Sequence, residues 1–235
     1  MYLTRWSVAG ALGALAFAGA AQAATTYDAD LADPGVYFGT GNANGHFTVE
    51  TAGGYELGLR ARTYPEAAVA PDHDNVYVVP LGDVVSFDWS FNPGAESTAA
   101  LFFSMSIENL ATGGTASFSP AGVLDNATSP DAVGGFQNSW RLSFGFLNGG
   151  PILDIPFVIF IPGLGDIDYD ANVDSSYKIT FGVNGAAAGP ISNTIYVNQG
   201  AGAAVPEPAT WAMMIMGFGA AGALLRRRRT AILAA

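Results

Sequence analysis

The chain contains no cysteine and only two histidines among its 235 residues. The lack of cysteine excludes disulfides, thiolate metal ligands and a cysteine nucleophile. Two histidines cannot form a three-histidine zinc site, and the H-E-x-x-H motif is absent. There is also no G-x-S-x-G motif and no glycine-rich phosphate loop between a strand and a helix. A dispersed catalytic triad or a chance pair of carboxylates would need no local motif, but no spacing favours either. We therefore expect a protein that is not an enzyme.

Positive charge is also scarce. Nine Lys and Arg residues stand against twenty Asp and Glu residues, and four of the nine are consecutive near the C-terminus. Between residues 24 and 204 there are four basic and nineteen acidic residues, which give a net charge of −15. The four are Arg60, Arg62, Arg141 and Lys178. Nucleic-acid binding needs a basic stripe, so no nucleic acid is expected as a partner. The acidic balance is compatible with solubility and with divalent cations.

Long apolar runs occur only near the two ends of the sequence. At the N-terminal end, 1–5 carries one positive charge, 6–19 is apolar, and Ala21-Gln22-Ala23 has small residues at its first and third positions. This order is typical of a secretory signal peptide. We expect a signal peptide over 1–23, with cleavage between Ala23 and Ala24.

At the C-terminal end, the uncharged run 209–225 follows Pro206-Glu207-Pro208. It is closed by four consecutive arginines, Arg226, Arg227, Arg228 and Arg229. Arginines are held on the cytoplasmic side, so this order predicts a single transmembrane helix with a stop-transfer cluster. At about 1.5 Å per residue the helix would span roughly 25 Å, near the lower limit for a bilayer core. Residues 200–205 are small and predict a flexible linker.

The same residues carry a family resemblance. The Pro206-Glu207-Pro208 tripeptide, the Trp211-Ala212 pair, the Met/Gly/Ala run and the arginine cluster resemble the PEP-CTERM protein-sorting domain in its PEPxxWA variant. The resemblance covers only 206–229. It implies that the tail is a substrate of exosortase, a membrane-embedded, cysteine transpeptidase-like enzyme of Gram-negative bacteria that make exopolysaccharide. It also implies recognition of the tripeptide, transient tethering in the inner membrane and removal of the tail. The alternative is an ordinary C-terminal membrane helix.

The region 24–199 reads as one all-β domain. Gly, Pro, Asn, Asp and Ser interrupt it about every ten residues, and short alternating apolar runs lie between the breaks. We expect an antiparallel β-sandwich, either jelly-roll or immunoglobulin-like. The expected strands are 36–38, 47–51, 55–62, 76–79, 84–91, 99–108, 115–119, 140–146, 177–183 and 194–198, with 157–161 either a buried strand or a loop.

The strand expected at 84–91 has the clearest alternation. Its apolar residues, which we expect in the core, are Val85, Phe87, Trp89 and Phe91. Its polar residues, which period-two alternation sends toward water, are Ser86, Asp88 and Ser90.

Two acidic segments are candidate metal sites. In 166–174 the carboxylates of Asp166, Asp168, Asp170 and Asp174 resemble the start of a D-x-D-x-D calcium loop. The segment departs from the EF-hand pattern, because Ala171 replaces the glycine and no glutamate follows at position twelve. The alternative is a plain acidic strand edge, which discourages edge-to-edge pairing. In 72–75, His73 lies between two aspartates, a pattern that fits either metal or acid–base chemistry or an exposed turn. Calcium is the only cofactor that the sequence suggests.

These features together predict an exported, non-catalytic protein of the cell surface or the exopolysaccharide matrix. The alternative is a carbohydrate-binding module, in which aromatic side chains such as Tyr37, Tyr64, Tyr77 and Trp140 would stack on sugars. A row of exposed aromatics on one sheet would favour the binding module. A smooth surface of Ser, Thr and Asn would favour the structural role.

Overall fold

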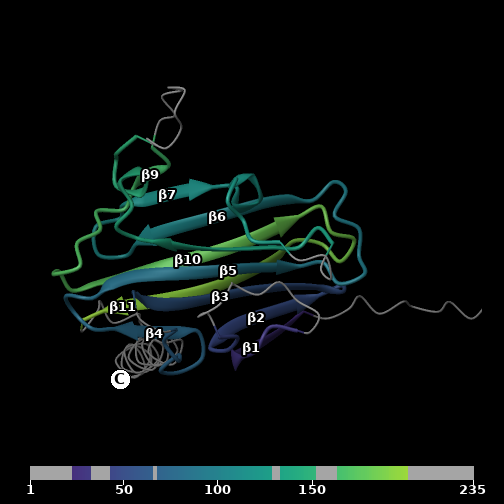
Figure 1. Cartoon of the computed structure of the whole chain (residues 1–235), viewed down its shortest axis with the longest axis horizontal. Helices are drawn as coiled ribbons and strands as arrows, with labels where there is room; N and C mark the ends of the chain where they lie inside the picture. The colour runs from purple at the N-terminus through teal and green to yellow at the C-terminus, as the bar shows by residue number, and fades with distance from the viewer. Residues whose placement is uncertain (1–22, 33–42, 66–67, 129–132, 152–162, 201–235) are drawn as a thin grey trace, which may run out of the picture.

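The computed structural model describes residues 23–32, 43–65, 68–128, 133–151 and 163–200 (Figure 1). These residues form strands and two short 3₁₀ helices and contain no α-helix. The elements are β1 (Ala24–Ala29), β2 (Phe47–Ala52), β3 (Tyr55–Tyr64), β4 (Val76–Val79), β5 (Val84–Asn92), β6 (Phe102–Asn109), β7 (Thr115–Phe118), η1 (Pro120–Gly122), β8 (Phe136–Arg141), η2 (Gly145–Leu147), β9 (Gly165–Asp166), β10 (Ser175–Asn184) and β11 (Ile191–Gln199). The all-β class is therefore confirmed.

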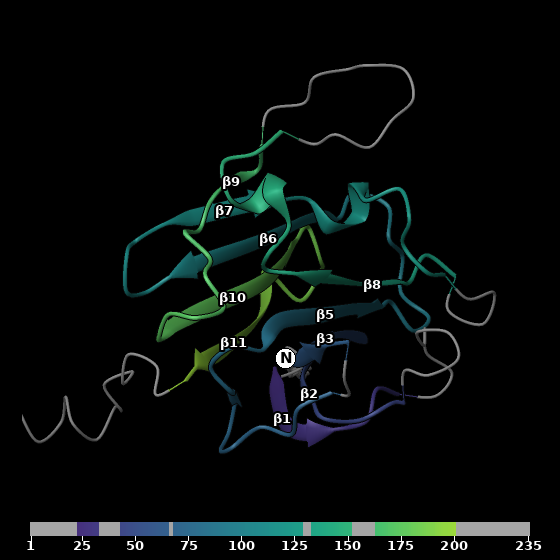
Figure 2. The same cartoon turned by 60° about the vertical axis from the view of Figure 1, so that its left-hand side comes forward.

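The strands form two sheets. A five-stranded sheet has the order β1-β2-β3-β5-β8, and a six-stranded sheet has the order β4-β11-β10-β6-β7-β9. Figure 2 shows the second order from β9 down to β11. All neighbouring strands are antiparallel except β4 and β11, which are parallel. The expectation of a purely antiparallel arrangement was wrong at this edge, because β4 lies in the connection from β3 to β5 and crosses to the other sheet. Asn75 fixes it there, since its amide donates to the Thr194 carbonyl at 2.8 Å.

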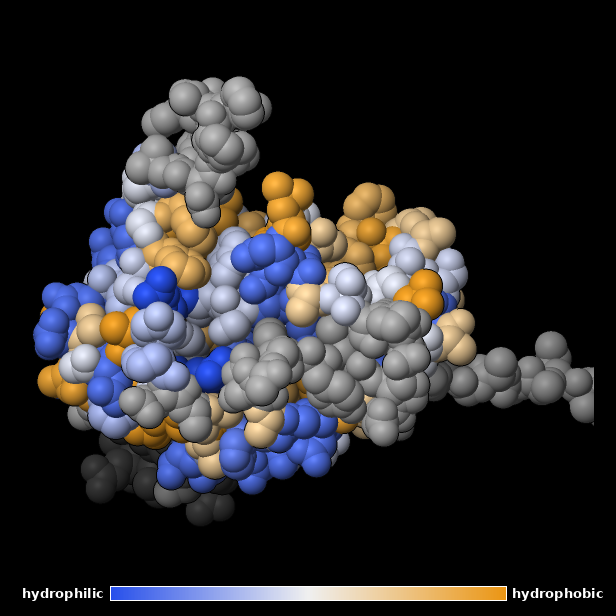
Figure 3. All heavy atoms as spheres, in the orientation of Figure 1, coloured by the Kyte–Doolittle hydropathy of each residue, from blue (hydrophilic) through white to orange (hydrophobic). Residues whose placement is uncertain are grey.

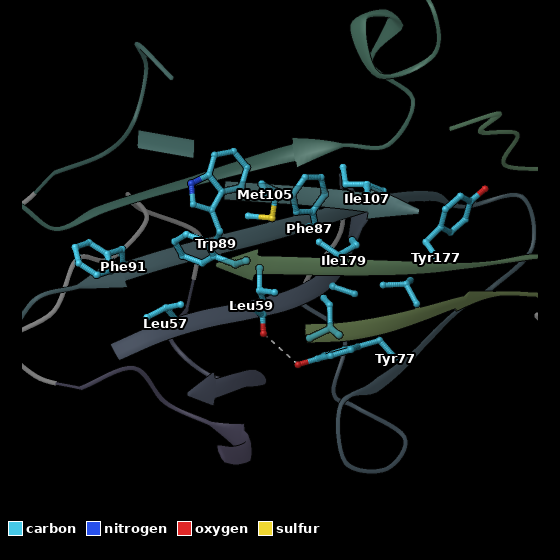
Figure 4. Close-up of a cluster of buried hydrophobic side chains, with 14 of the residues drawn as sticks. Leu57, Leu59, Tyr77, Phe87, Trp89, Phe91, Met105, Ile107, Tyr177 and Ile179 are labelled. Atoms are coloured by element: carbon cyan, nitrogen blue, oxygen red, sulfur yellow. Dashed lines mark hydrogen bonds between the residues drawn. The ribbon is translucent and has the colours of Figure 1, made fainter. Parts of the chain in front are cut away.

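Apolar side chains from both sheets form one core. In Figure 4, Leu59, Phe87 and Trp89 of the five-stranded sheet lie beside Met105 and Ile179 of the six-stranded sheet. Aromatic rings join the layers, with the Phe91 and Phe103 ring centroids 4.8 Å apart. The inward set predicted for β5 is fully buried, as expected. Face-to-face sheets filled by aromatic residues explain why the domain needs no disulfide.

One strand prediction failed, strand β1 was missed, and two further predictions lie outside the described residues. The strand expected over 140–146 ends at Arg141, and the chain then turns through η2. Asn148 causes the turn, because its amide donates to the carbonyls of Leu142 and Phe144. Strand β1 was not predicted, since its residues are mostly exposed and carry no apolar alternation. The expected strands at 36–38 and 157–161 lie outside the described residues.

The outer face of the five-stranded sheet is covered. Ser86, Asp88 and Ser90 are buried, so the prediction that they face water was wrong. Over Gly58 and Arg60 the cover is an N-terminal strap, which we define as residues 29–32 and 43–46. Leu31 of the strap lies over Gly58, where an added Cβ would be 2.5 Å from the Leu31 Cδ2 atom. The Asn44 side chain accepts from the Leu31 N–H and donates to the Leu31 carbonyl, which closes the strap.

We expect Gly58→Val to lower the free energy of unfolding by about 1–3 kcal/mol, the usual cost of overpacking. The new side chain would meet Leu31 and Phe47 and push the strap away from the sheet. Urea unfolding measures the change. Gly145→Val is the matched control, because a Cβ there meets no atom within 4 Å. Equal losses in the two variants would show that the strap does not press on Gly58.

Candidate functional site

The predicted sorting residues lie at the two ends of the chain. Outside the described residues lie the motif residues Pro206, Glu207, Pro208, Trp211 and Ala212, the cluster Arg226–Arg229, and Ala21 of the predicted signal peptide. Ala23 and Ala24 are described and exposed, and Ala24 is the first residue of the edge strand β1. The predicted cleavage point is therefore at the start of the folded domain. Within the part of the chain that the structure describes, no helix is long and apolar enough to cross a bilayer. The helix expected at 209–225 is outside that part.

The acidic segment 166–174 does not gather its carboxylates. Asp166 Oδ1 accepts the N–H of Asp168, and Asp170 Oδ1 accepts the N–H of Asn172, so each closes a local turn. The intervening apolar residues anchor the segment, because Ile167 is buried and the hydroxyl of Tyr169 accepts from the Val85 N–H. Among the described residues, no three Asp, Glu or His side chains form a group that could hold a metal ion. Calcium binding here stays a prediction, and this geometry gives it no support.

The two histidines lie in separate exposed turns. His73 Nδ1 is 2.9 Å from Asp72 Oδ2, and the turn is closed by a hydrogen bond from the Asp72 N–H to the Val76 carbonyl. His46 Nδ1 is 2.7 Å from Asp28 Oδ1 in the strap region. Each histidine therefore pairs with a solvent-exposed aspartate, as an Asx-rich turn would arrange it.

The candidate sugar-stacking aromatics do not form a row. Tyr37 lies outside the described residues, and Tyr77 is fully buried, with its hydroxyl donating to the His46 carbonyl at 2.9 Å. Burial raises the pKa of Tyr77 to about 12. Trp140 is half-buried and stacks on Phe118 with centroids 4.4 Å apart. Of the three members of the set that the structure describes, Tyr64 alone is exposed, at 51%.

The outer face of the six-stranded sheet is polar. The strand register places four hydroxyl side chains in one row across β11, β10, β6 and β7. They are Thr194, Thr180, Ser106 and Ser117, and the first two hydroxyls are 3.0 Å apart. A neighbouring row adds Ser192 and Ser104, which flank Gly182. On the molecular face that Figure 3 shows, hydrophilic residues spread over the middle, while hydrophobic residues gather along the upper edge.

A buried ionic cluster lies under the strap, and the sequence did not predict it. Arg60, which is 1% exposed, donates from Nε to Asp88 Oδ2 at 2.6 Å. Its Nη1 donates to the carbonyls of Ala43 and Gly45 at 2.9 and 2.8 Å. The second oxygen of Asp88 lies 3.8 Å from Arg62 Nη1. Burial raises the pKa of Asp88, and the two guanidinium groups act against that rise. Asp88 thus connects the sheet to the strap through Arg60.

A second buried carboxylate fixes the other strap segment. Both oxygens of Glu56 accept the N–H of Ala32, at 3.2 and 3.0 Å. Burial raises the pKa of Glu56, and the Ala32 N–H opposes the rise. In the sequence, Asp88 and Glu56 are visible only as acidic residues on the polar faces of predicted strands. Nothing in that pattern indicates that they are buried.

Comparison with known families identifies one feature of the chain. The model of the PEP-CTERM protein-sorting motif matches residues 204–229, which confirms the predicted resemblance of the tail. No curated protein and no solved structure matches the chain. The match leaves the β domain unassigned, so its jelly-roll or immunoglobulin-like character stays a prediction. The sorting motif implies export and processing of a membrane-associated precursor by exosortase-type machinery. The chain therefore carries a PEP-CTERM protein-sorting motif, the signal of an exported precursor that is processed at the membrane.

Proposed function

We propose that the protein is a non-catalytic component of the cell surface or exopolysaccharide matrix of a Gram-negative bacterium, released there after its sorting tail is removed. The observation that carries the proposal is the sorting motif at 204–229. The polar hydroxyl rows of the six-stranded sheet support it, because a surface of Ser, Thr and Asn hydrates well and suits contact with a hydrated matrix. A signal peptide over 1–23 would bring the chain to the export machinery.

The arrangement of the titratable groups supports a non-catalytic role. The described buried carboxylates have structural partners: Asp88 bonds Arg60, Glu56 bonds the strap backbone, and Glu50 accepts from the Thr25 hydroxyl. His46 and His73 belong to different turns, and each bonds an exposed aspartate. A general acid or base needs access to a substrate and an environment that tunes it, and these groups are committed to the fold or to local turns.

The carbohydrate-binding alternative requires aromatic side chains that present their faces together. The exposed aromatic residues of the described chain are Tyr27, Tyr64 and Phe102, which lie on three different strands. The polar sheet face therefore favours the structural role over sugar stacking by an aromatic row.

Replacing Pro206, Glu207 and Pro208 with alanine should abolish removal of the tail, because the tripeptide is the part of the motif that the processing enzyme is expected to recognise. The intact mass of protein recovered from envelope and medium measures this. Wild-type protein should begin at Ala24 and end near the tripeptide. The variant should keep 209–235 and stay in the membrane fraction.

Thr210→Ala is the matched control, since residue 210 occupies an x position of PEPxxWA. It should be processed like the wild type. If wild-type protein recovered from cells retains 209–235, the tail is a resident anchor and the matrix proposal fails.

A further inference from the structure

The chain leaves the described domain at a point that several hydrogen bonds fix. Strand β11 ends at Gln199, whose buried side chain donates from Nε2 to the carbonyls of Asp83 and Ala171, both at 2.9 Å. The next N–H along the chain, that of Gly200, donates to the Val79 carbonyl at 2.8 Å. The last residues of β11 lie beside β4, at the lower left of Figure 1. The sorting tail therefore starts from a fixed position on the domain.

Two turns surround this point. We define the exit face as residues 80–83, which join β4 to β5, residues 170–174, which precede β10, and residue 200. The N–H of Gly82 donates to the Ala171 carbonyl at 2.8 Å, so the two turns are bonded to each other. A Cβ added to Gly200 would contact the Asp174 side chain and would lie 3.3 Å from the Leu81 Cδ1 atom. Side chains of both turns thus lie next to the departing chain.

The exit face presents apolar side chains to solvent. Leu81 is 49% exposed and Val173 is 54% exposed. Val78, which is also exposed, lies opposite Asn198 next to the end of β11. Three of the eight large apolar side chains that are exposed in the described part of the chain therefore lie around its last residues. Apolar side chains that gather at one place on a surface mark an interaction site.

The charge of the exit face is negative. Asp83, Asp170 and Asp174 are exposed on its turns, and it includes no Lys, Arg or His. Such a face repels anionic lipid headgroups and attracts a protein surface that carries basic residues. The combination of apolar and acidic side chains therefore fits a basic protein surface with an apolar contact better than it fits a bilayer.

The length of the linker determines which protein meets this face. Only residues 201–205 separate Gly200 from Pro206. At about 3.6 Å per residue, the Cα atoms of Gly200 and Pro206 can be at most about 22 Å apart. Even a small protein domain is about 30 Å across. An enzyme that binds the Pro206-Glu207-Pro208 tripeptide must therefore lie beside the end of the domain from which the linker leaves.

We propose that the exit face is a docking surface for the enzyme that removes the sorting tail, and that this enzyme contacts it through a basic surface with an apolar patch. The inference rests on the proposed processing of the tail and adds a second recognition element to the tripeptide. Because the linker is short, binding of the tripeptide makes contact with the exit face an intramolecular event, so a weak contact prolongs the complex. The hydrogen-bonded turns present Leu81 and Val173 with little ordering cost.

The double variant Leu81→Lys/Val173→Lys, in the full-length precursor, should slow removal of the tail at least about fivefold, because positive charges would then face a basic surface. Pulse–chase labelling in cells that process the wild type measures the rate, and intact mass identifies the product. Both side chains are exposed, so the variant should keep the urea midpoint of the wild type.

Leu124→Lys/Val133→Lys is the matched control, because it makes the same change at two exposed apolar residues. These residues line a cavity with Phe103, near the start of β6. The exit face lies toward the other end of that strand, where Asn109 accepts from the hydroxyl of Ser175. The control should be processed at the wild-type rate.

A second variant changes no residue of the folded domain and serves if the lysine variant does not fold. About fifteen Gly and Ser residues inserted after Gly202 lower the effective concentration of the exit face at the bound enzyme, so removal of the tail should slow. If the domain only obstructs the enzyme, the longer linker should make removal faster, and the inference fails.

Two further results would overturn the inference. One is removal at the wild-type rate or faster in Leu81→Lys/Val173→Lys, since added positive charge favours contact with anionic lipid. The other is equal slowing in Leu124→Lys/Val133→Lys. A wild-type protein that keeps its tail would overturn the proposed function together with this inference. Normal processing that does not respond to changes in the exit face would overturn the inference alone.

Discussion

Asp88→Ala should lower the free energy of unfolding by about 3–5 kcal/mol, the usual cost of removing one partner from a buried ion pair. The variant leaves the Arg60 guanidinium in a site that is 1% exposed, with its charge uncompensated. Arg60 also holds the strap through the carbonyls of Ala43 and Gly45, so the cover of the outer sheet face should loosen with it. Urea unfolding followed by tryptophan fluorescence measures the loss.

Asp83→Ala is the control for the loss of an acid, because Asp83 is exposed just before the same strand and should cost less than about 0.5 kcal/mol. A double-mutant cycle isolates the pair. Arg60→Met should cost less in the Asp88→Leu background than in the wild type, since the two groups interact directly. Additive losses would show that the ion pair is not the source of the stability.

The burial of Asp88 shows what the alternation of apolar and polar residues along a strand cannot predict. The alternation in β5 correctly identified which residues share a face, because side chains on a strand alternate whatever surrounds them. It did not identify what covers the second face. That depends on Leu31 and Asn44, which reach the sheet from outside any predicted strand. Asp88 therefore bonds Arg60, which bonds the strap, and does not face water. A strand with a solvated polar face and a strand whose polar face holds a buried ion pair have the same alternating sequence pattern.

The candidate sites differ in the same way, because some are consecutive in the sequence and others are brought together only by the fold. The sorting tail could be predicted from the sequence because its motif is consecutive and is recognised as a linear segment. The acids of 166–174 are also consecutive, but spacing alone does not bring carboxylates to one point, and the backbone turns at Asp166 and Asp170 use them locally. Arg62 and Arg141 are 79 positions apart in the sequence, and the β3-β5-β8 register places both opposite Ser86.

The order of the strands also could not be predicted from the sequence. The parallel contact of β4 with β11 depends on a crossover and on the Asn75 amide, and neither leaves a periodic pattern. Other buried side-chain amides hold the chain in place in the same way. Gln199 donates to the carbonyls of Asp83 and Ala171, and Asn109 donates to the carbonyl of Ile167. These side chains hydrogen-bond loops to the ends of strands. Asn and Gln residues have no sequence pattern that predicts this role.

Another buried amide joins the two sheets, and we expect Asn193→Leu to lower the free energy of unfolding by about 2–6 kcal/mol. Asn193 lies on β11 at 2% exposure, and its Nδ2 donates to the carbonyls of Thr48 and Leu57 in the other sheet, at 2.7 and 2.8 Å. Leucine would leave both carbonyls buried without this donor, at about 1–3 kcal/mol each.

The matched control for that variant is Asn198→Leu on the opposite face of the same strand. Asn198 is half-buried and accepts from the Ser176 hydroxyl, so its loss leaves no carbonyl buried between the sheets and should cost less than about 1 kcal/mol. Thermal and urea unfolding should agree on the ranking. Hydrogen exchange adds a local reading, because amides of β2 and β11 should lose protection in Asn193→Leu before those of β6. If the two variants are equally stable, the sheets are held by the aromatic core alone, and the amide bridge only follows their packing.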